Sequence, residues 1–318
     1  MNEFGLIQRY FTRPAANAVL GVGDDAAIVR PTPGHDLHVS VDMLVEGRHF
    51  FADVAPRALG HKTLAVNLSD MAAMGATPRW AVLSLALPQL DEHWVSEFAA
   101  GFFGLAEEHG LSVIGGDTTR GPLTLSVTIF GETPAGQALR RDAAQAGDDI
   151  WVSGKLGLAA LAVRQRLHGD IAVPDSVIAE CKRKLEYPTP RVELGQRLLG
   201  LSHAAIDISD GLMADLGHIL TCSGVGAEVW LDALPTQSWL TENRLDVVET
   251  IAAGGGRLRT VLYRPALDSL RLATVGRRTA LPAGPYRRHS QRPKRVPAQR
   301  FGTARGAWQH RVFPFLKF

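Results

Sequence analysis

Apolar and polar positions follow two alternating periods along this chain. Residues 37–42 read Leu-His-Val-Ser-Val-Asp, and this every-second-residue pattern predicts a half-buried strand. Residues 55–74 repeat their apolar side chains at steps of three and four, which predicts a helix. The same reading of the whole chain predicts these strands and helices: strands 37–42, 80–87, 111–114, 123–131, 149–154, 204–208 and 226–231, and helices 55–74, 92–109, 157–168 and 212–222.

A polar, loop-like stretch interrupts this alternation at residues 134–147. We therefore predict an N-terminal domain over residues 1–137 and a C-terminal α/β domain over residues 138–255. Strands and helices alternate in both halves, so the predicted fold class is α/β (α+β), with two α/β sandwiches rather than one barrel. A length of 318 residues also fits two domains.

The composition is typical of a soluble globular protein and excludes a membrane-spanning or disulfide-rich one. The apolar fraction of 46% and the mean hydropathy of +0.01 fit a soluble α/β protein. No apolar run approaches the ~20 residues that span a bilayer, and the N-terminus lacks a secretory signal, so we expect a cytoplasmic protein without membrane contacts. Cys181 and Cys222 are too few for a disulfide framework or a zinc site.

The net charge of +2 is the sum of an acidic first part and a strongly basic C-terminal part of the chain. Residues 257–318 contain thirteen Arg, two Lys and a single acid, so their balance is +14 and residues 1–256 carry −12. The first part resembles an acidic, metal-binding enzyme. A basic end that contacts nucleic acid is the alternative, but aromatic residues are sparse there and no nucleic-acid motif occurs, so that partner is disfavoured.

Short acidic motifs beside Gly or Ser recur over about 190 residues of the chain. There are six of them: Gly23-Asp24-Asp25, Val41-Asp42, Leu68-Ser69-Asp70, Gly115-Gly116-Asp117, Gly147-Asp148-Asp149 and Asp207-Ile208-Ser209-Asp210. Carboxylates gathered at strand ends repel one another unless a cation binds, and Mg²⁺ is the usual cation for oxygen ligands that also meet phosphates. Ordinary helix caps and turns remain the alternative for each motif taken alone.

Two of these motifs, and two cationic residues outside them, are candidates for a site. Asp70 lies on an otherwise apolar helix face, which is costly unless something pairs with it. The pair Asp207 and Asp210 straddles a strand-to-helix junction, where an N-cap explains one acid but not a second one inside the strand. His49 and Arg141 could each contact a phosphate, although a surface histidine and a solvated loop arginine are equally plain explanations.

The Gly115-Gly116-Asp117-Thr118 segment is predicted to form a turn after a buried strand. Glycines let backbone amides approach phosphate oxygens, and the Asp could hold a metal ion. The chain has no Gly-x4-Gly-Lys-Ser/Thr pattern, so a nucleotide would be bound by another kind of fold.

In this order the motifs resemble the thiamine-monophosphate kinase family, part of an ATP-binding superfamily that includes aminoimidazole ribonucleotide synthetase and selenophosphate synthetase. Besides the acidic motifs, the resemblance rests on four further segments: Glu3-Phe4-Gly5-Leu6-Ile7, Val45-Glu46-Gly47-Arg48-His49-Phe50, Asn67-Leu68-Ser69-Asp70 and Tyr187-Pro188-Thr189-Pro190-Arg191. It covers about residues 3 to 255. The resemblance implies the superfamily's two-domain fold, in which the N-terminal sheets pair in a homodimer and helices cover the C-terminal sheet.

The resemblance also implies an activity, which is ATP-dependent phosphorylation of thiamine monophosphate to thiamine diphosphate by direct in-line transfer with Mg²⁺. Metals and cationic groups contribute most to such a transfer. The roles that it implies, residue by residue, are metal ligands at Asp25, Asp42, Asp70, Asp117 and Asp210, catalytic positions at Asp117 and Asp210, ATP contacts at Gly115, Gly116, Asp117, Arg141 and Ser209, and a substrate contact at His49.

Other members of the superfamily fit less well. Selenophosphate synthetase needs a reactive Cys near its N-terminus, and this chain has none before Cys181. A hydrogenase-maturation relative would end in a reactive Cys, whereas this chain ends Leu-Lys-Phe. A purine-synthesis ligase remains a candidate with a poorer match at Glu46 to Phe50. A non-catalytic protein that binds Mg-ATP is the alternative from another class.

The match ends at residue 256, where the family pattern continues Asp-Asp-Tyr-Glu-Leu and this chain reads Gly-Arg-Leu-Arg-Thr-Val. The codons GAC GAC TAC GAA CTG, read after one extra G, give that second sequence. We therefore hypothesise that the divergent Arg-rich end, residues 256–318, is a frameshifted reading that impairs the enzyme. Sequencing the gene from independent isolates tests this hypothesis, because an uninterrupted frame in all of them would contradict it.

Overall fold

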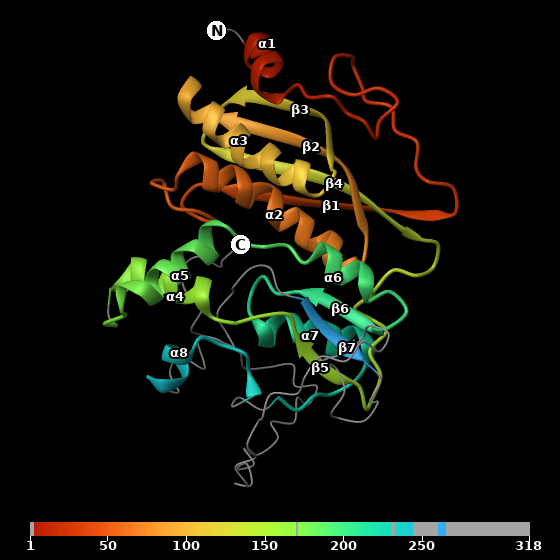
Figure 1. The fold of residues 1–318 in the computed structure, drawn as a ribbon, viewed down its shortest axis with the longest axis vertical. Coiled ribbons are helices and arrows are strands. Elements are labelled where there is room, and N and C mark those ends of the chain that lie inside the picture. Colours follow the sequence, from red (N-terminus) through yellow and green to blue (C-terminus); the bar gives the residue numbers. More distant parts are fainter. Residues whose placement is uncertain (1–2, 170, 230–232, 244–259, 265–318) are drawn as a thin grey trace, which may run out of the picture.

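The computed structural model describes residues 3–169, 171–229, 233–243 and 260–264, and they form two units, each with its own sheet and core (Figure 1). The N-terminal sheet has the order β1-β4-β2-β3. Its strands are β1 (His35–Val45), β2 (Thr77–Leu87), β3 (Ser112–Arg120) and β4 (Thr124–Pro134). Strand β4 pairs antiparallel with β1 and β2, while β2 and β3 are parallel.

Two long helices cover one face of this sheet, α2 (Pro56–Met74) and α3 (Glu92–Glu108) (Figure 1). Helix α2 begins with Pro56 in its first turn and ends at Gly75, whose left-handed backbone (φ 72°) lets its N–H bond to Ala72 O. Helix α3 is capped by the Asp91 carboxylate, which accepts from Trp94 N at 3.1 Å. Helix α3 supplies the crossover that the parallel pair β2–β3 requires.

Glycines bring α2 and α3 unusually close. A Cβ atom at Gly101 of α3 would collide with the Arg57 carbonyl oxygen, and one at Gly60 of α2 would collide with the Phe98 carbonyl oxygen. The backbones of the two helices are therefore in direct contact, which fixes how α2 lies on the sheet.

The other face of β1 carries exposed apolar side chains. The side chains of Leu37, Val39, Val41 and Met43 point to one side of the strand, and the residues are 43, 60, 61 and 54% exposed. An apolar row of this kind on an open sheet is typical of a surface that pairs with a partner.

The second unit contains a three-stranded antiparallel sheet of order β5-β7-β6. The strands are β5 (Asp149–Val152), β6 (Ala204–Asp207) and β7 (Thr260–Arg264). The remaining elements are α1 (Glu3–Leu6) and the π-helical turn η1 (Ile7–Phe11) in the first unit, and α4 (Leu158–His168), α5 (Asp175–Glu186), α6 (Val192–Arg197), α7 (Leu212–Ser223) and α8 (Ser238–Glu242) in the second.

The α/β fold class and the two sheets predicted from the sequence are confirmed. The predicted turn at residues 115–118 is wrong, because β3 continues through it alongside β2, with a bulge at Ala81/Val82. Residues 226–229 of the predicted strand 226–231 form no strand. Strand β7 falls within the divergent end, whose residues 256–259 and 265–318 lie outside the described ones. Among the helices that the structure describes, none is long and apolar enough to cross a membrane.

Gly101→Ala tests the close contact of α2 and α3. We expect it to lower the free energy of unfolding by about 1–3 kcal/mol, because the new methyl group forces the two backbones apart. Gly104→Ala on the same helix is the matched control, since nothing lies within 4 Å of a Cβ there and Ala favours helix more than Gly. Urea unfolding of both variants measures the difference, and equal stabilities would contradict this account of the packing.

Candidate functional site

Three carboxylates from three different elements gather where the two units meet. Asp42 lies on β1, Asp70 on α2 and Asp207 at the end of β6, and we call these residues the acidic cluster. The charges of Asp207 and Asp42 act on Asp70, and the Asp42 charge also acts on Asp207. The cluster therefore joins residues that are up to 165 positions apart in the chain.

Hydroxyl groups bond to two of these carboxylates, and an amide oxygen holds the backbone of the third residue. Ser40 Oγ donates to Asp70 Oδ2 at 2.5 Å, and Ser69 Oγ donates to Asp207 Oδ2 at 3.1 Å, which links α2 to the second unit. Asn67 Oδ1 accepts from Asp42 N at 3.2 Å. Neutral hydroxyl donors therefore hold the carboxylates of Asp70 and Asp207, and Asn67 holds the backbone of Asp42.

The local electrostatics oppose ionisation of the cluster. Burial, followed by the Asp207 charge, raises the pKa of Asp70 to about 7, against smaller lowering effects of Ser40 and Arg141. Burial likewise raises the pKa of Asp207 to about 6, although Ser69 and Arg141 lower it. Burial and mutual repulsion both disfavour the ionised carboxylates of this cluster, and a bound cation would relieve both effects.

Asp215 organises the corner that follows Asp207. Its Oδ2 atom accepts hydrogen bonds from the backbone N–H groups of Ser209, Asp210 and Gly211 at 2.9, 3.1 and 3.2 Å. Burial raises the pKa of Asp215 above its usual range in spite of these bonds. The carboxylate therefore fixes the backbone of the turn, and the Ser209 and Asp210 side chains project from a rigid loop.

A pocket of about 350 Å³ brings together two of the acidic motifs. One wall is the loop Gly21–Ala27 with Asp24 and Asp25, and the other is the part of β3 that contains Gly115, Gly116 and Asp117. Gly116 has no room for a side chain, because a Cβ atom there would collide with the Leu83 carbonyl oxygen of β2. Glycine therefore lets β3 approach β2, and the exposed Asp117 faces solvent at the pocket.

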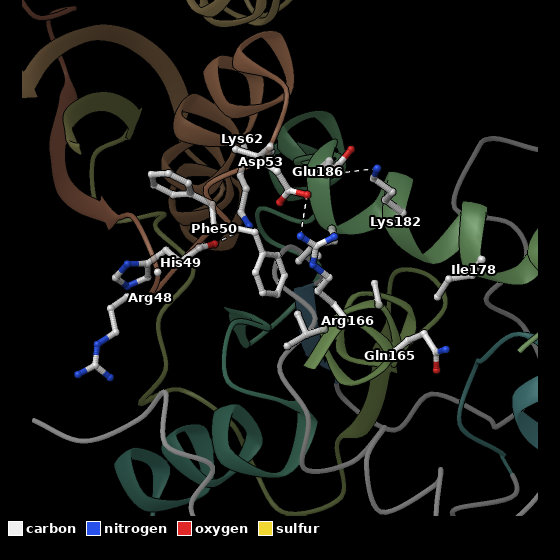
Figure 2. Close-up of a pocket in the computed structure, with 16 residues that line it drawn as sticks. Arg48, His49, Phe50, Asp53, Lys62, Gln165, Arg166, Ile178, Lys182 and Glu186 are labelled. Carbon is white, nitrogen blue, oxygen red and sulfur yellow. Dashed lines mark hydrogen bonds and ion pairs between the residues drawn. The ribbon is translucent and has the colours of Figure 1, made fainter. Parts of the chain in front are cut away.

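A second pocket, of about 330 Å³, lies between residues 47–54 of the first unit and helices α4 and α5 of the second (Figure 2). Lys62 is buried at its edge and donates to His49 O at 2.9 Å. Arg166 donates to Asp53 Oδ2 at 2.7 Å and its guanidinium lies 5.3 Å from the centre of the Phe51 ring. These contacts hold the segment that contains His49 against α4.

His49 and Arg48 lie at one end of the second pocket in Figure 2, while Ile178 and Gln165 lie at the other. The Nδ1 atom of His49 accepts from Val45 N at 3.0 Å, so its imidazole is oriented by the backbone. The Gln165 Oε1 atom is buried and has no hydrogen-bond partner among the residues that the structure describes.

The structure distributes the predicted site residues over neighbouring regions. Asp25, Gly115, Gly116 and Asp117 share the first pocket, whereas Asp42 and Asp70 belong to the acidic cluster, which the Arg141 charge reaches. Within the described ranges, no three His, Cys, Asp or Glu side chains form a ready-made metal-binding group.

Two of the carboxylates described above are missing from the sequence-based assignment of roles. Asp207 lies inside an apolar strand, which is the sequence signal that marks it, but the family resemblance implies no role for it. Asp215 lies four residues after Gly211 on the next helix, and no pattern in the sequence marks it.

Comparison with known proteins places this architecture in a family. Residues 23–133 match the model of the AIR synthase related protein, N-terminal domain. Thiamine-monophosphate kinase of Haemophilus influenzae is 42% identical over 261 residues, which are 80% of this chain and 79% of the relative.

Solved structures agree with this relationship. Thiamine-monophosphate kinase from Stenotrophomonas maltophilia superimposes with a TM-score of 0.77 at 47% identity, over 84% of this chain and 87% of that one. AaThiL complexed with AMPPCP and TMP gives a TM-score of 0.68 at 30% identity, over 74% and 77% of the two chains. The acidic motifs, the two sheets and the similarity to these relatives together show that the chain belongs to the thiamine-monophosphate kinase family.

Proposed function

We propose that this chain transfers the terminal phosphate of ATP to thiamine monophosphate, giving thiamine diphosphate and ADP. The observation that carries the proposal is the acidic cluster, in which Asp70 and Asp207 lie together with their pKa values raised. Such a site attracts cations, and cations neutralise the charge of phosphates that must approach each other. Membership of the family supports the identity of both substrates.

Mg²⁺ fits this donor set, because carboxylate oxygens are its preferred protein ligands and a cation would offset the burial and repulsion that oppose ionisation of the cluster. The residues that would hold it are the five predicted ligands together with the one that the structure adds: Asp25, Asp42, Asp70, Asp117, Asp210 and Asp207. Bound Mg²⁺ would neutralise phosphate charge during the transfer. Asp117 and Asp210 are proposed to act beside the transferred phosphate.

ATP is proposed to bind with its phosphates at the pocket between the loop Gly21–Ala27 and β3. The backbone at Gly115 and Gly116 is free of side-chain bulk there, which suits contact with phosphate oxygens. Ser209 and Arg141 are proposed to complete the phosphate contacts from the second unit, and Arg141 already lies near the acidic cluster.

Thiamine monophosphate is proposed to bind beside His49, with its rings in the pocket between residues 47–54 and helices α4 and α5. The walls supply the buried Phe50 ring and apolar side chains that pack against aromatic rings, and Arg48 and His49 at one end suit the phosphate group. We also propose that the enzyme acts in the cytoplasm, where its co-substrate ATP is abundant.

The domain boundaries proposed from the sequence, at residues 137 and 255, separate the elements of the two sheets with one difference. Strand β7 pairs with both β5 and β6, although Thr260–Arg264 lies within the divergent end. The C-terminal unit is therefore proposed to extend at least to residue 264. The frameshift hypothesis concerns residues that lie, apart from this strand, outside the described ones.

A homodimer is proposed in which the open faces of two N-terminal sheets pack together. The exposed apolar row of Leu37, Val39, Val41 and Met43 supports this arrangement, because two such faces would remove one another from water. Helices α2 and α3 cover the opposite face, so the row is the part of this sheet that can accept a second copy (Figure 1).

Formation of thiamine diphosphate from thiamine monophosphate, ATP and Mg²⁺ is the first test of the function. We expect product from the unaltered chain and a rate at least about a hundredfold lower for Asp210→Asn, because charge neutralisation at the phosphates is lost. Glu107→Gln, an exposed position on α3, is the matched control and should keep its rate. Binding of Mg-ATP without turnover would instead indicate a non-catalytic nucleotide-binding relative.

Val41→Asp tests the homodimer. A charge in the middle of the apolar row should shift the protein toward monomer, as measured by sedimentation equilibrium, with little change in folding because Val41 is 61% exposed. Leu90→Asp changes an apolar residue that is 46% exposed outside the row, and it should leave the dimer intact. A protein that is monomeric before any substitution would refute the arrangement.

The acidic cluster predicts a pH dependence of stability in the absence of Mg²⁺. Because the pKa of Asp70 is about 7 in the folded chain and about 3.9 in an unfolded one, the folded chain binds more protons between these values. The free energy of unfolding should therefore fall, on the order of a few kcal/mol, from about pH 4 to pH 7 and then level off.

Urea unfolding in a chelator across this range measures the effect, and Asp70→Asn should flatten the curve. Adding Mg²⁺ at pH 8 should stabilise the unaltered chain more than this variant, because a ligand of the folded state raises its stability. A curve that rises with pH through this window would contradict the inferred electrostatics.

A further inference from the structure

The loop of residues 17–32 forms one wall of the proposed nucleotide pocket, yet little apolar packing holds it. Its two arms pair through hydrogen bonds of 2.9 and 3.0 Å between the backbones of Leu20 and Ile28. Val19 and Ile28, which could have anchored the arms in the core, are 58 and 52% exposed. The position of Asp24 and Asp25 therefore depends on how the two ends of the loop are attached.

The first end is attached at Asn17. The buried Trp80 of β2 donates its Nε1–H to Asn17 O at 2.8 Å, and Asn17 Nδ2 donates to Gly110 O at 2.9 Å. This end is thus fixed to the start of β2 and to the segment between α3 and β3.

The second end is attached at Thr32, by a carboxylate of β4. Glu132 accepts from Thr32 N through Oε1 and from Thr32 Oγ1 through Oε2, both at 2.7 Å. Arg79 Nε donates to Glu132 Oε2 at 2.8 Å, and Arg79 Nη2 donates to Thr32 Oγ1 at 3.3 Å. Three groups from β4, β2 and the loop therefore form one closed network.

Glu132 is 2% exposed, so its charge needs these partners. Burial alone would raise the pKa of Glu132, but the hydrogen bonds from Thr32 and the Arg79 charge outweigh it and hold the pKa below its usual range. The sheet itself does not require the carboxylate, because β4 is already paired through its backbone with β1 and β2. The carboxylate instead binds the backbone N–H and the hydroxyl group of Thr32, which belong to the loop.

We propose that Glu132 is a positioning residue for the nucleotide pocket, acting through Thr32 to fix the loop that presents Asp24 and Asp25 opposite Asp117. The nucleotide part of this inference rests on the proposed function, whereas the anchoring does not. Direct substitution of Glu132 would leave Arg79 without its buried partner and could unfold the protein. Thr32, which is half-buried at the base of the loop, offers the cleaner test.

Thr32→Val removes the hydroxyl group and keeps the shape of the side chain, while Thr32→Ser keeps the hydroxyl group. In the valine variant we expect faster hydrogen exchange at the amides of Leu20 and Ile28 and unchanged exchange in β3. The KM for Mg-ATP should rise about fivefold or more, which is the effect of one lost hydrogen bond. The KM for thiamine monophosphate should stay within about twofold, and the serine variant should behave as the unaltered chain.

Two results would overturn the proposal. Exchange at Leu20 and Ile28 that is the same in both variants and the unaltered chain would show that the network does not hold the loop. Equal weakening by serine, which keeps the hydroxyl group, and by valine, which lacks it, would show that the effect does not come from the hydroxyl hydrogen bonds. If the unaltered chain forms no product, the proposed function fails. The positioning role is then still decided by hydrogen exchange and by calorimetric binding of Mg²⁺ with a non-hydrolysable ATP analogue.

Discussion

Helix α2 is the element on which the rest of the structure depends, because it is buried on nearly every side. Its residues contact the sheet, α3 and the second unit, and most of them are buried irrespective of their place in the helical turn. Ser69 and Asp70 are consecutive, yet Ser69 bonds to Asp207 of the second unit and Asp70 to Ser40 of the sheet. A shift of this helix would therefore separate the carboxylates that form the site.

Close backbone contact keeps α2 in place on both of its long sides. Gly60 and Gly101 allow α3 to approach it, and Gly195 of α6 does the same on the side of the second unit, where a Cβ would collide with Ala72 O. Packing of this kind tolerates almost no displacement. The free energy gained by burying α2 can thus hold Asp70 and Asp207 in an arrangement that their mutual repulsion opposes, which is a usual property of functional sites.

Most of this organisation could be predicted from local patterns. The sequence pattern located α2, α3, α4, α7 and strands β1 to β6, and an acid on an apolar helix face identified Asp70. The patterns failed where tertiary contacts decide the outcome. The glycines at 115 and 116 suggested a turn, but they lie in a strand because Gly116 must pass the backbone of β2. The Asp215 carboxylate accepts a hydrogen bond from the backbone of Ser209, six residues earlier in the chain, and no periodic pattern in the sequence predicts such a contact.

The two halves of the proposed site are held in place by different kinds of interaction. Asp42, Asp70 and Asp207 project from a strand, a helix and a strand end, so the packing of the core fixes them. Asp24 and Asp25 lie on a loop with exposed arms, which polar contacts must hold at its ends. Hydrogen bonds are directional but individually weak. The loop side of the proposed site therefore depends on a few polar contacts, whereas the packing of the core fixes the side on which the proposed phosphate transfer needs precise geometry.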